Sequence, residues 1–111
     1  MRVQKVIFVK ANWCPHCRVS EKYVKLIAKE LNAEILYLDI DNKEEEKQAD
    51  EIVKKYGDWS ADYLIPQVFL RFEDGTVKHI LTGDPKGIDF TIKKWDSFLT
   101  SDFYIKLKPT S

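Results

Sequence analysis

Cysteine, net charge and long apolar runs are what this sequence has least of, and each shortage narrows the range of functions. The chain holds two cysteines among 111 residues, too few for the disulfide framework of a small secreted domain. Its 18 basic and 18 acidic residues balance, so bulk charge predicts neither a nucleic-acid partner nor binding to an anionic membrane surface. No apolar run is long enough to span a bilayer.

The remaining composition is that of an ordinary soluble globular domain, with 44% hydrophobic and 32% charged residues. The length suits one domain, 1–111, in which 100–111 forms a C-terminal extension, and we expect a monomer. Residues 1–5 lead directly into a short predicted strand, without the basic segment, apolar stretch and cleavage site of a signal peptide. We therefore expect a cytoplasmic protein.

The two cysteines lie three positions apart in Trp13-Cys14-Pro15-His16-Cys17, between a predicted strand and a predicted helix. The unbroken apolar run at 6–9 is typical of a strand buried on both faces. Apolar residues then recur every four positions along 19–31, as in a helix with one buried face. Because proline suits the first helical position, we predict that Cys14 is the N-cap residue of this helix.

This position makes Cys14 the predicted nucleophile. The free amides of the first turn and the helix dipole favour thiolate over thiol, and can lower a cysteine pKa from about 8.5 to about 3.5–7.5. Cys17 lies one turn further on the same side, close enough for a disulfide and more sheltered from solvent, and is the predicted resolving thiol. Pro15 and His16 are predicted to tune the pair, His16 through a charge that changes near neutral pH; the alternative is an exposed histidine that tunes nothing.

The rest of the chain predicts alternating strands and helices. A second strand covers 34–40, and Asn42 with Glu45 forms a capping box for a helix that ends at Gly57. A hairpin follows, with strands at 67–72 and 77–81 around a turn at 73–76, and then a closing helix. The buried face of that helix is predicted to hold Ile88, Ile92, Trp95 and Leu99.

Three segments leave alternatives open. The alternating residues of 103–107 predict either an edge strand or a segment lying against the body. Trp59 and Tyr63, in the loop 58–64, could form a substrate wall or pack over the sheet end. His79 falls in register with Val77 and Leu81, and is interpreted as a packed or hydrogen-bonded histidine in preference to a ligand.

A close cysteine pair in a reducing compartment is redox-active or binds metal. A zinc site needs four ligands, and the only histidines are His16, inside the pair, and His79, far along the chain. We therefore predict no metal site and no cofactor, and keep a metal-binding or protein-binding module as the alternative function. A disulfide oxidase or isomerase is a further alternative, which a reduction potential near about −120 mV would favour over about −270 mV.

Three motifs together resemble the thioredoxin superfamily over nearly the whole chain, up to about Leu99. They are the Trp13–Cys17 segment, Ile65-Pro66 at the start of the third strand, and Phe72-Glu73-Asp74-Gly75 in the hairpin. Trp13 is similar to its counterpart in thioredoxins, Pro66-Gln67-Val68-Phe69 to glutaredoxins, and the Pro15-His16 centre to periplasmic disulfide-forming oxidases.

The resemblance implies an α/β thioredoxin-like fold, with a central four-stranded mixed sheet flanked by helices in the order β-α-β-α-β-β-α. It implies a cis Pro66 beside the cysteines, with Trp13, Ile65 and Pro66 contacting an extended substrate. Thioredoxins carry a buried acid six positions before the first cysteine, as proton acceptor for the resolving thiol, and here that position is Phe8.

The activity implied is that of a thiol–disulfide oxidoreductase, acting on a disulfide-containing protein or a low-molecular-weight disulfide through a Cys14–Cys17 dithiol. A disulfide reductase or a small thiol would regenerate the reduced pair.

Overall fold

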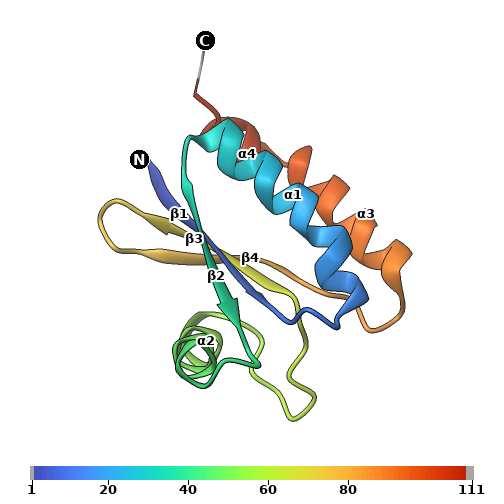
Figure 1. The fold of residues 1–111 in the computed structure, drawn as a ribbon. Coiled ribbons are helices and arrows are strands. Elements are labelled where there is room, and N and C mark those ends of the chain that lie inside the picture. Colours follow the sequence, from blue (N-terminus) through green and yellow to red (C-terminus); the bar gives the residue numbers. More distant parts are fainter. Residues whose placement is uncertain (1, 110–111) are drawn as a thin grey trace.

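The computed structural model describes residues 2–109 and shows a mixed sheet of four strands between two layers of helices (Figure 1). The elements in chain order are β1 (Val3–Lys10), α1 (Pro15–Leu31), β2 (Glu34–Asp39), α2 (Lys43–Tyr56), β3 (Gln67–Phe72), β4 (Val77–Thr82), α3 (Ile88–Leu99) and α4 (Asp102–Leu107). The predicted order is confirmed through α3, and α4 is an addition to it.

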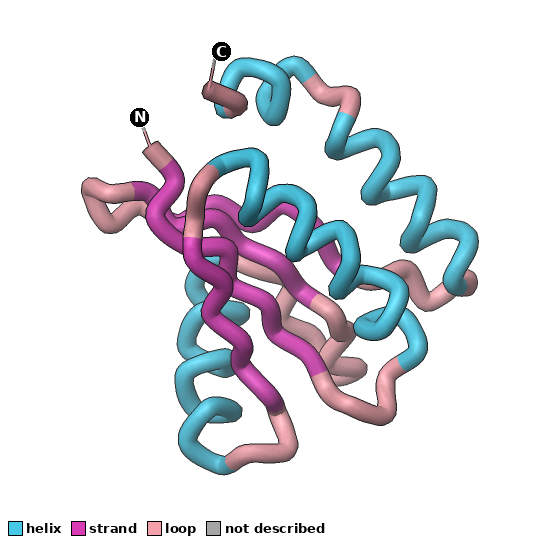
Figure 2. The backbone as a smooth tube through the Cα atoms, turned by 45° about the horizontal axis from the view of Figure 1, so that its top comes forward, coloured by secondary structure: helices cyan, strands magenta, loops and turns pink. Residues whose placement is uncertain are grey.

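The strands lie in the order β2-β1-β3-β4. β1 and β2 are parallel, because α1 carries the chain back along the sheet between them. β3 runs antiparallel to both β1 and β4, and a tight turn joins it to β4. Figure 2 shows α1, α3 and α4 on one face of the sheet and α2 on the other. The carboxyl end of β1 therefore delivers the chain to the start of α1 at one edge of the molecule.

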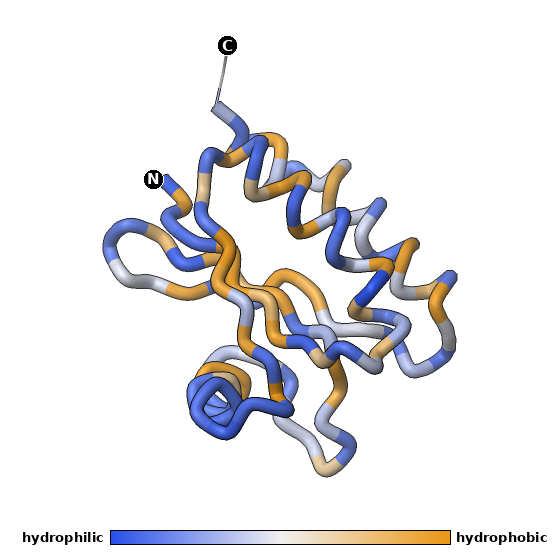
Figure 3. The backbone as a smooth tube through the Cα atoms, in the orientation of Figure 1, coloured by the Kyte–Doolittle hydropathy of each residue, from blue (hydrophilic) through white to orange (hydrophobic). Residues whose placement is uncertain are grey.

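The two faces of β1 belong to two separate cores, as the unbroken apolar run predicts. Val6 and Phe8 face α1 and α3, whereas Ile7 and Val9 face α2, and none of the four is more than 1% exposed. In Figure 3 the apolar residues are concentrated along the central strands and the inner sides of the helices. Burying both faces of β1 fixes the strand that leads into the cysteine pair.

The start of α2 differs from the predicted capping box in one bond. Asn42 caps the helix as expected, since its Oδ1 accepts from the amides of Glu44 at 3.1 Å and Glu45 at 3.2 Å. The Glu45 carboxylate does not return to the Asn42 amide, and accepts instead from the amide of Asp39 at 3.0 Å. Asn42 N–H donates to Asp39 O at 3.0 Å, which leaves Glu45 available to anchor the end of β2.

The predicted edge strand at 103–107 is wrong, and the alternative, a segment lying against the body, is confirmed. Ser101 Oγ accepts from the amide of Tyr104 at 3.2 Å and starts the short helix α4. Tyr104 is fully buried, and its ring centroid lies 5.0 Å from that of Phe98 on α3. An apolar pair at positions 104 and 107 fits one helical turn as well as 103, 105 and 107 fit a strand, and burial of Tyr104 decides between them.

Two further details of side-chain placement depart from the predictions. The register between β3 and β4 shifts beside Leu81, so His79 lies opposite Phe69 on the α2 face while Leu81 turns to the other face. Along α3 the fully buried residues are Thr91 and Trp95, and Ile88 is exposed. The prediction placed the buried face of α3 by its apolar residues alone, and it therefore left out the polar but buried Thr91.

Candidate active site

The cysteine pair lies where β1 ends and α1 begins, with the predicted capping geometry. Cys14 is the N-cap residue, in extended conformation, and Pro15 occupies the first turn. The amide of Cys17 donates to Cys14 Sγ at 3.1 Å. A sulfur in this position takes the place of the side-chain oxygen that usually caps a helix, and it receives N–H groups that would otherwise be unpaired.

These contacts separate the two thiols chemically. A hydrogen bond from the Cys17 thiol is the largest influence on Cys14, and with the amides of Cys17 and His16 it lowers the pKa of Cys14 to about 7 against the opposing effect of burial. The same hydrogen bond, together with burial, strongly raises the pKa of Cys17. Cys14 therefore ionises first, and the proton that the pair then keeps lies on Cys17.

Both cysteines are free thiols and both are only 3% exposed, so Cys17 is no more sheltered than Cys14. The expected difference in exposure between them is wrong. It fails because the loop before β3 covers Cys14, whose Sγ lies 4.0 Å from the carbonyl oxygen of Ile65. The sulfur of Cys14 thus lies against the backbone of Ile65.

The structure brings the Ile65-Pro66 segment against the cysteines, and its peptide bond is cis, as the resemblance implies. Gly83 lets the chain after β4 pack closely against this segment, a role that sequence reasoning missed. A Cβ on Gly83 would lie 2.6 Å from Ile65 O and 2.7 Å from Pro66 Cδ, and Gly83 N–H donates to Pro66 O at 2.8 Å. A cleft of about 160 Å³ lies beside it, lined by His16, Leu64, Ile65, Gly83, Asp84 and Pro85.

His16 is half-buried and is tied to the opposite helix. Its Nδ1 lies 2.7 Å from the hydroxyl oxygen of Thr91, which also accepts from the amide of Asp84 at 2.9 Å. Thr91 therefore connects α1, α3 and the loop after β4. Nothing in the sequence pointed to this threonine, apart from its being a polar residue in the stripe of α3 that packs on the core.

Trp13 is 61% exposed, next to Cys14 on the outer side of the turn. Its indole Nε1 donates to Asp41 Oδ2 at 2.9 Å, in the connection between β2 and α2. The ring is thereby held at the surface instead of packing into the core. Trp13 adjoins Cys14 in the sequence, and the fold brings Ile65, 51 residues away, against Cys14.

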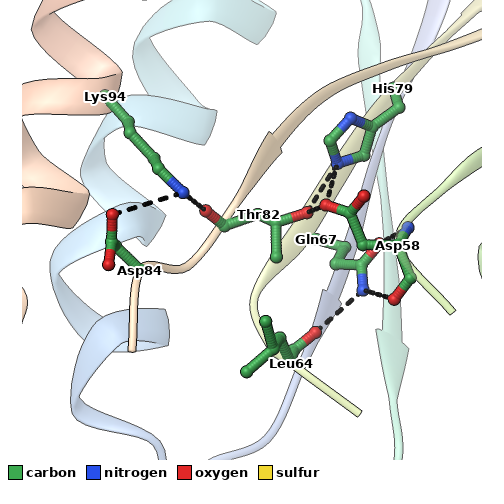
Figure 4. A network of polar contacts seen from close by, with 7 residues as sticks. All are labelled: Asp58, Leu64, Gln67, His79, Thr82, Asp84 and Lys94. Atoms are coloured by element: carbon green, nitrogen blue, oxygen red, sulfur yellow. Dashed lines mark hydrogen bonds and ion pairs between the residues drawn. The ribbon is translucent and has the colours of Figure 1, made fainter. Parts of the chain in front are cut away.

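A second polar cluster holds the loop that precedes the cis peptide bond (Figure 4). The buried Gln67 donates to Leu64 O at 2.9 Å and to Asp58 O at 3.1 Å, and its Oε1 accepts from Asp58 N at 3.0 Å. The Thr82 hydroxyl donates to the Asp58 carboxylate and accepts from His79 Nε2 at 2.6 Å. The interpretation of His79 as hydrogen-bonded is confirmed.

Packing accounts for one of the two aromatic residues of the loop. The Tyr63 hydroxyl donates to Asp50 Oδ1 on α2 at 2.6 Å, and its ring meets that of Trp59 edge-on at 5.4 Å. Trp59 itself is 46% exposed, with Lys54 Nζ over its face. Tyr63 therefore fixes the loop to α2, while Trp59 presents an aromatic surface.

Position 8, where thioredoxins carry a buried acid, holds a phenylalanine that makes a hydrophobic contact. Phe8 is 1% exposed, and its ring centroid lies 5.9 Å from that of Tyr37 on β2.

No group of three His, Cys, Asp or Glu side chains within residues 2–109 is arranged to hold a metal ion. None of the helices in that range is both long and apolar enough to cross a membrane.

Comparisons with known proteins bear on the fold. No protein-family model and no curated protein matches the chain. Oxidized thioredoxin O1 from Arabidopsis thaliana is 18% identical over 83% of this chain and 77% of its own, with a TM-score of 0.51. A malarial protein (14% identical, 91% and 100% covered, TM-score 0.48) and the reduced C-terminal domain of Neisseria meningitidis DsbD (17%, 86% and 81%, TM-score 0.45) are also similar.

The first of these similarities, with the strand order and the helices on both faces, defines a thioredoxin-like fold, and the predicted fold class is confirmed. On this scaffold Cys14 and Cys17 have the C-x-x-C spacing at the amino end of α1. The protein is a thioredoxin-like scaffold that carries a closely spaced dithiol.

Proposed function

We propose that the protein is a thiol–disulfide oxidoreductase, which reduces disulfides in proteins or small molecules through a reversible Cys14–Cys17 disulfide. The observation that supports this most directly is the 3.1 Å bond from Cys17 N–H to Cys14 Sγ, in a pair in which Cys14 ionises before Cys17. A thiolate of pKa near ambient pH is the most effective attacking group in disulfide exchange.

The reaction then proceeds in two exchanges. The Cys14 thiolate attacks one sulfur of the substrate disulfide, a Cys14–substrate disulfide forms, and the other substrate sulfur leaves as a thiolate that takes a proton from water. Cys17 loses its proton and attacks Cys14 Sγ, which breaks the mixed disulfide and releases the second substrate thiol. Two electrons pass from the protein to the substrate, and the Cys14–Cys17 disulfide remains.

The surroundings of Cys14 suit an extended substrate. Its sulfur faces Ile65 O at 4.0 Å, so a substrate cysteine attacked there lies alongside the backbone of the Ile65-Pro66 segment. Trp13, the neighbour of Cys14 in the sequence, is 61% exposed and offers an apolar surface. We assign substrate contact to Trp13, Ile65 and Pro66, and we assign the tuning of the cysteine pair to Pro15 and His16.

We assign the reaction to the cytoplasm, where thiols stay reduced, and to a monomer. A disulfide reductase or a small thiol would return the pair to its reduced form. The reduction potential tests this direction: a value near about −270 mV supports net reduction, and one near about −120 mV favours net oxidation of substrates.

Two single-cysteine variants test the function itself. Catalysed reduction of a protein disulfide should be lost in Cys14→Ser, while Cys17→Ser should accumulate a mixed disulfide between Cys14 and the substrate. The Ser20→Ala variant serves as a control for folding, since Ser20 is buried on the same helix and its hydroxyl accepts from Trp95 Nε1 at 2.9 Å. The function is wrong if the wild-type protein and Cys14→Ser reduce the substrate at the same rate.

A further inference from the structure

The resolving step needs a proton acceptor, because Cys17 holds its proton under the conditions in which Cys14 attacks. The hydrogen bond to Cys14 raises the pKa of Cys17 most, and burial, which persists after Cys14 has entered the mixed disulfide, also raises it. The first-strand position six residues before Cys14 holds Phe8, which has no group that accepts a proton. An acceptor side chain must therefore come from outside the first strand.

A small cavity lies directly beside Cys17. Its volume is about 60 Å³, enough for a water molecule, and its lining consists of Phe8, Lys10, Ala11, Asn12, Cys17, Arg18 and Glu21. The Lys10 and Arg18 side chains offer N–H donors, and Asn12 accepts a hydrogen bond from Lys10. Glu21 is the one carboxylate among these lining residues.

Glu21 follows Cys17 by four positions on α1, so the two side chains are neighbours on one face of the helix. The carboxylate is held in place from two sides: the Tyr37 hydroxyl on β2 donates to Oε2 at 3.3 Å, and Lys25 Nζ lies 3.5 Å from the same oxygen. Tyr37 in turn contacts the ring of Phe8. The side chains that fill the site of the missing acid thus also orient a carboxylate on the adjacent helix.

We propose that Glu21 accepts the proton of Cys17 through water in this cavity during the resolving step. The proposal rests on the proposed function. As the Cys17 proton passes through water to the Glu21 carboxylate, the Cys17 sulfur attacks Cys14 Sγ, the new disulfide forms, and the substrate thiolate leaves. The Glu21 side chain is 44% exposed, so it returns its proton to solvent before the next turnover.

The decisive variant is Glu21→Gln, which keeps the shape of the side chain and removes the base. Reduced protein is mixed with a small chromogenic disulfide in single turnover, and release of the first and second thiol is followed separately. The first, which reports attack by Cys14, should keep its rate. The second should slow by about tenfold or more near pH 6.5, within the effect of general bases, and recover as pH rises and hydroxide takes the proton.

Three further variants separate this role from general electrostatics and from folding. Glu34→Gln removes one acidic charge at an exposed site paired with Lys5, away from the cavity, and should leave both phases unchanged. Tyr37→Phe should slow the second phase by a smaller factor, and Glu21→Asp should restore part of the rate. Lys25→Met removes the neighbouring ion pair and leaves the acceptor in place.

The outcomes distinguish this proposal from the proposed function. If the wild-type protein releases both thiols and Glu21→Gln matches it across the pH range, Glu21 is not the acceptor and the oxidoreductase function stands. If the wild-type protein releases neither thiol, the proposed function itself fails. A slow second phase in Glu21→Gln that does not recover at high pH also contradicts the proposal, since it indicates a structural effect.

Discussion

The hydrogen bond from the Cys17 thiol lowers the pKa of Cys14 more than any other contact. Removing this donor should therefore change the titration of Cys14. The Cys17→Ala variant deletes this donor and leaves the amide of residue 17 in place. A hydrogen bond to a charged group contributes about 1.5–3 kcal/mol, and about 1.36 kcal/mol corresponds to a tenfold change in an ionisation constant. The pKa of Cys14 should therefore rise by about one to two in Cys17→Ala.

Cys17→Ser supplies the matched control, because its hydroxyl can donate to the same sulfur and it forms no disulfide. Thiolate absorbance measured against pH gives the pKa of Cys14 in both variants. Exchange with a small disulfide at about pH 6 should be about three- to tenfold slower in the alanine variant, since the smaller thiolate fraction is partly offset by higher nucleophilicity. Equal titration curves in the two variants would refute the assigned role of the Cys17 thiol.

Other parts of the fold give further predictions. Gly83→Ala should lower the free energy of unfolding by about 1–3 kcal/mol, measured by urea denaturation, because the new Cβ overlaps Ile65 O. Tyr104→Ala should cost about 3 kcal/mol or more by loss of a fully buried ring, whereas Tyr104→Phe should cost about 1 kcal/mol. Burial lowers the pKa of His79, so the unfolded chain binds the proton more readily; stability should fall as pH drops below about 6.5, and His79→Gln should weaken that dependence.

The centre of the site could be predicted because it depends on local rules. The cap at Cys14, the helix start at Pro15 and the strand before them follow from neighbouring residues, and the structure reproduces each of them. The same holds for the end of α2 at Gly57. Local geometry is sufficient where one helix terminus sets the chemistry.

The surroundings of the pair could not be predicted, because they depend on contacts between distant parts of the chain. Thr91 meets His16 across 75 residues, and Trp13 meets Asp41 across 28. Cys14 Sγ meets Ile65 O across 51 residues. No periodicity in the sequence encodes such pairs, since they are determined only when the sheet is assembled.

The wrong predictions for 103–107 and for Leu81 also come from contacts that form only when the chain is folded. Alternating apolar residues at 103–107 also satisfy one helical turn, and the pocket that takes Tyr104 exists only after α1 and α3 have packed. Leu81 changed faces because a register shift between β3 and β4 inserts an extra residue, which a strict period of two does not anticipate.

The most direct test of the central claim is a count of thiols during a single reaction with a small disulfide, followed by mapping of the cysteine linkage. Reduced protein should release two thiols per chain and end with a Cys14–Cys17 disulfide, through a transient adduct on Cys14. Release of one thiol with a stable adduct, or no release at all, would contradict the account.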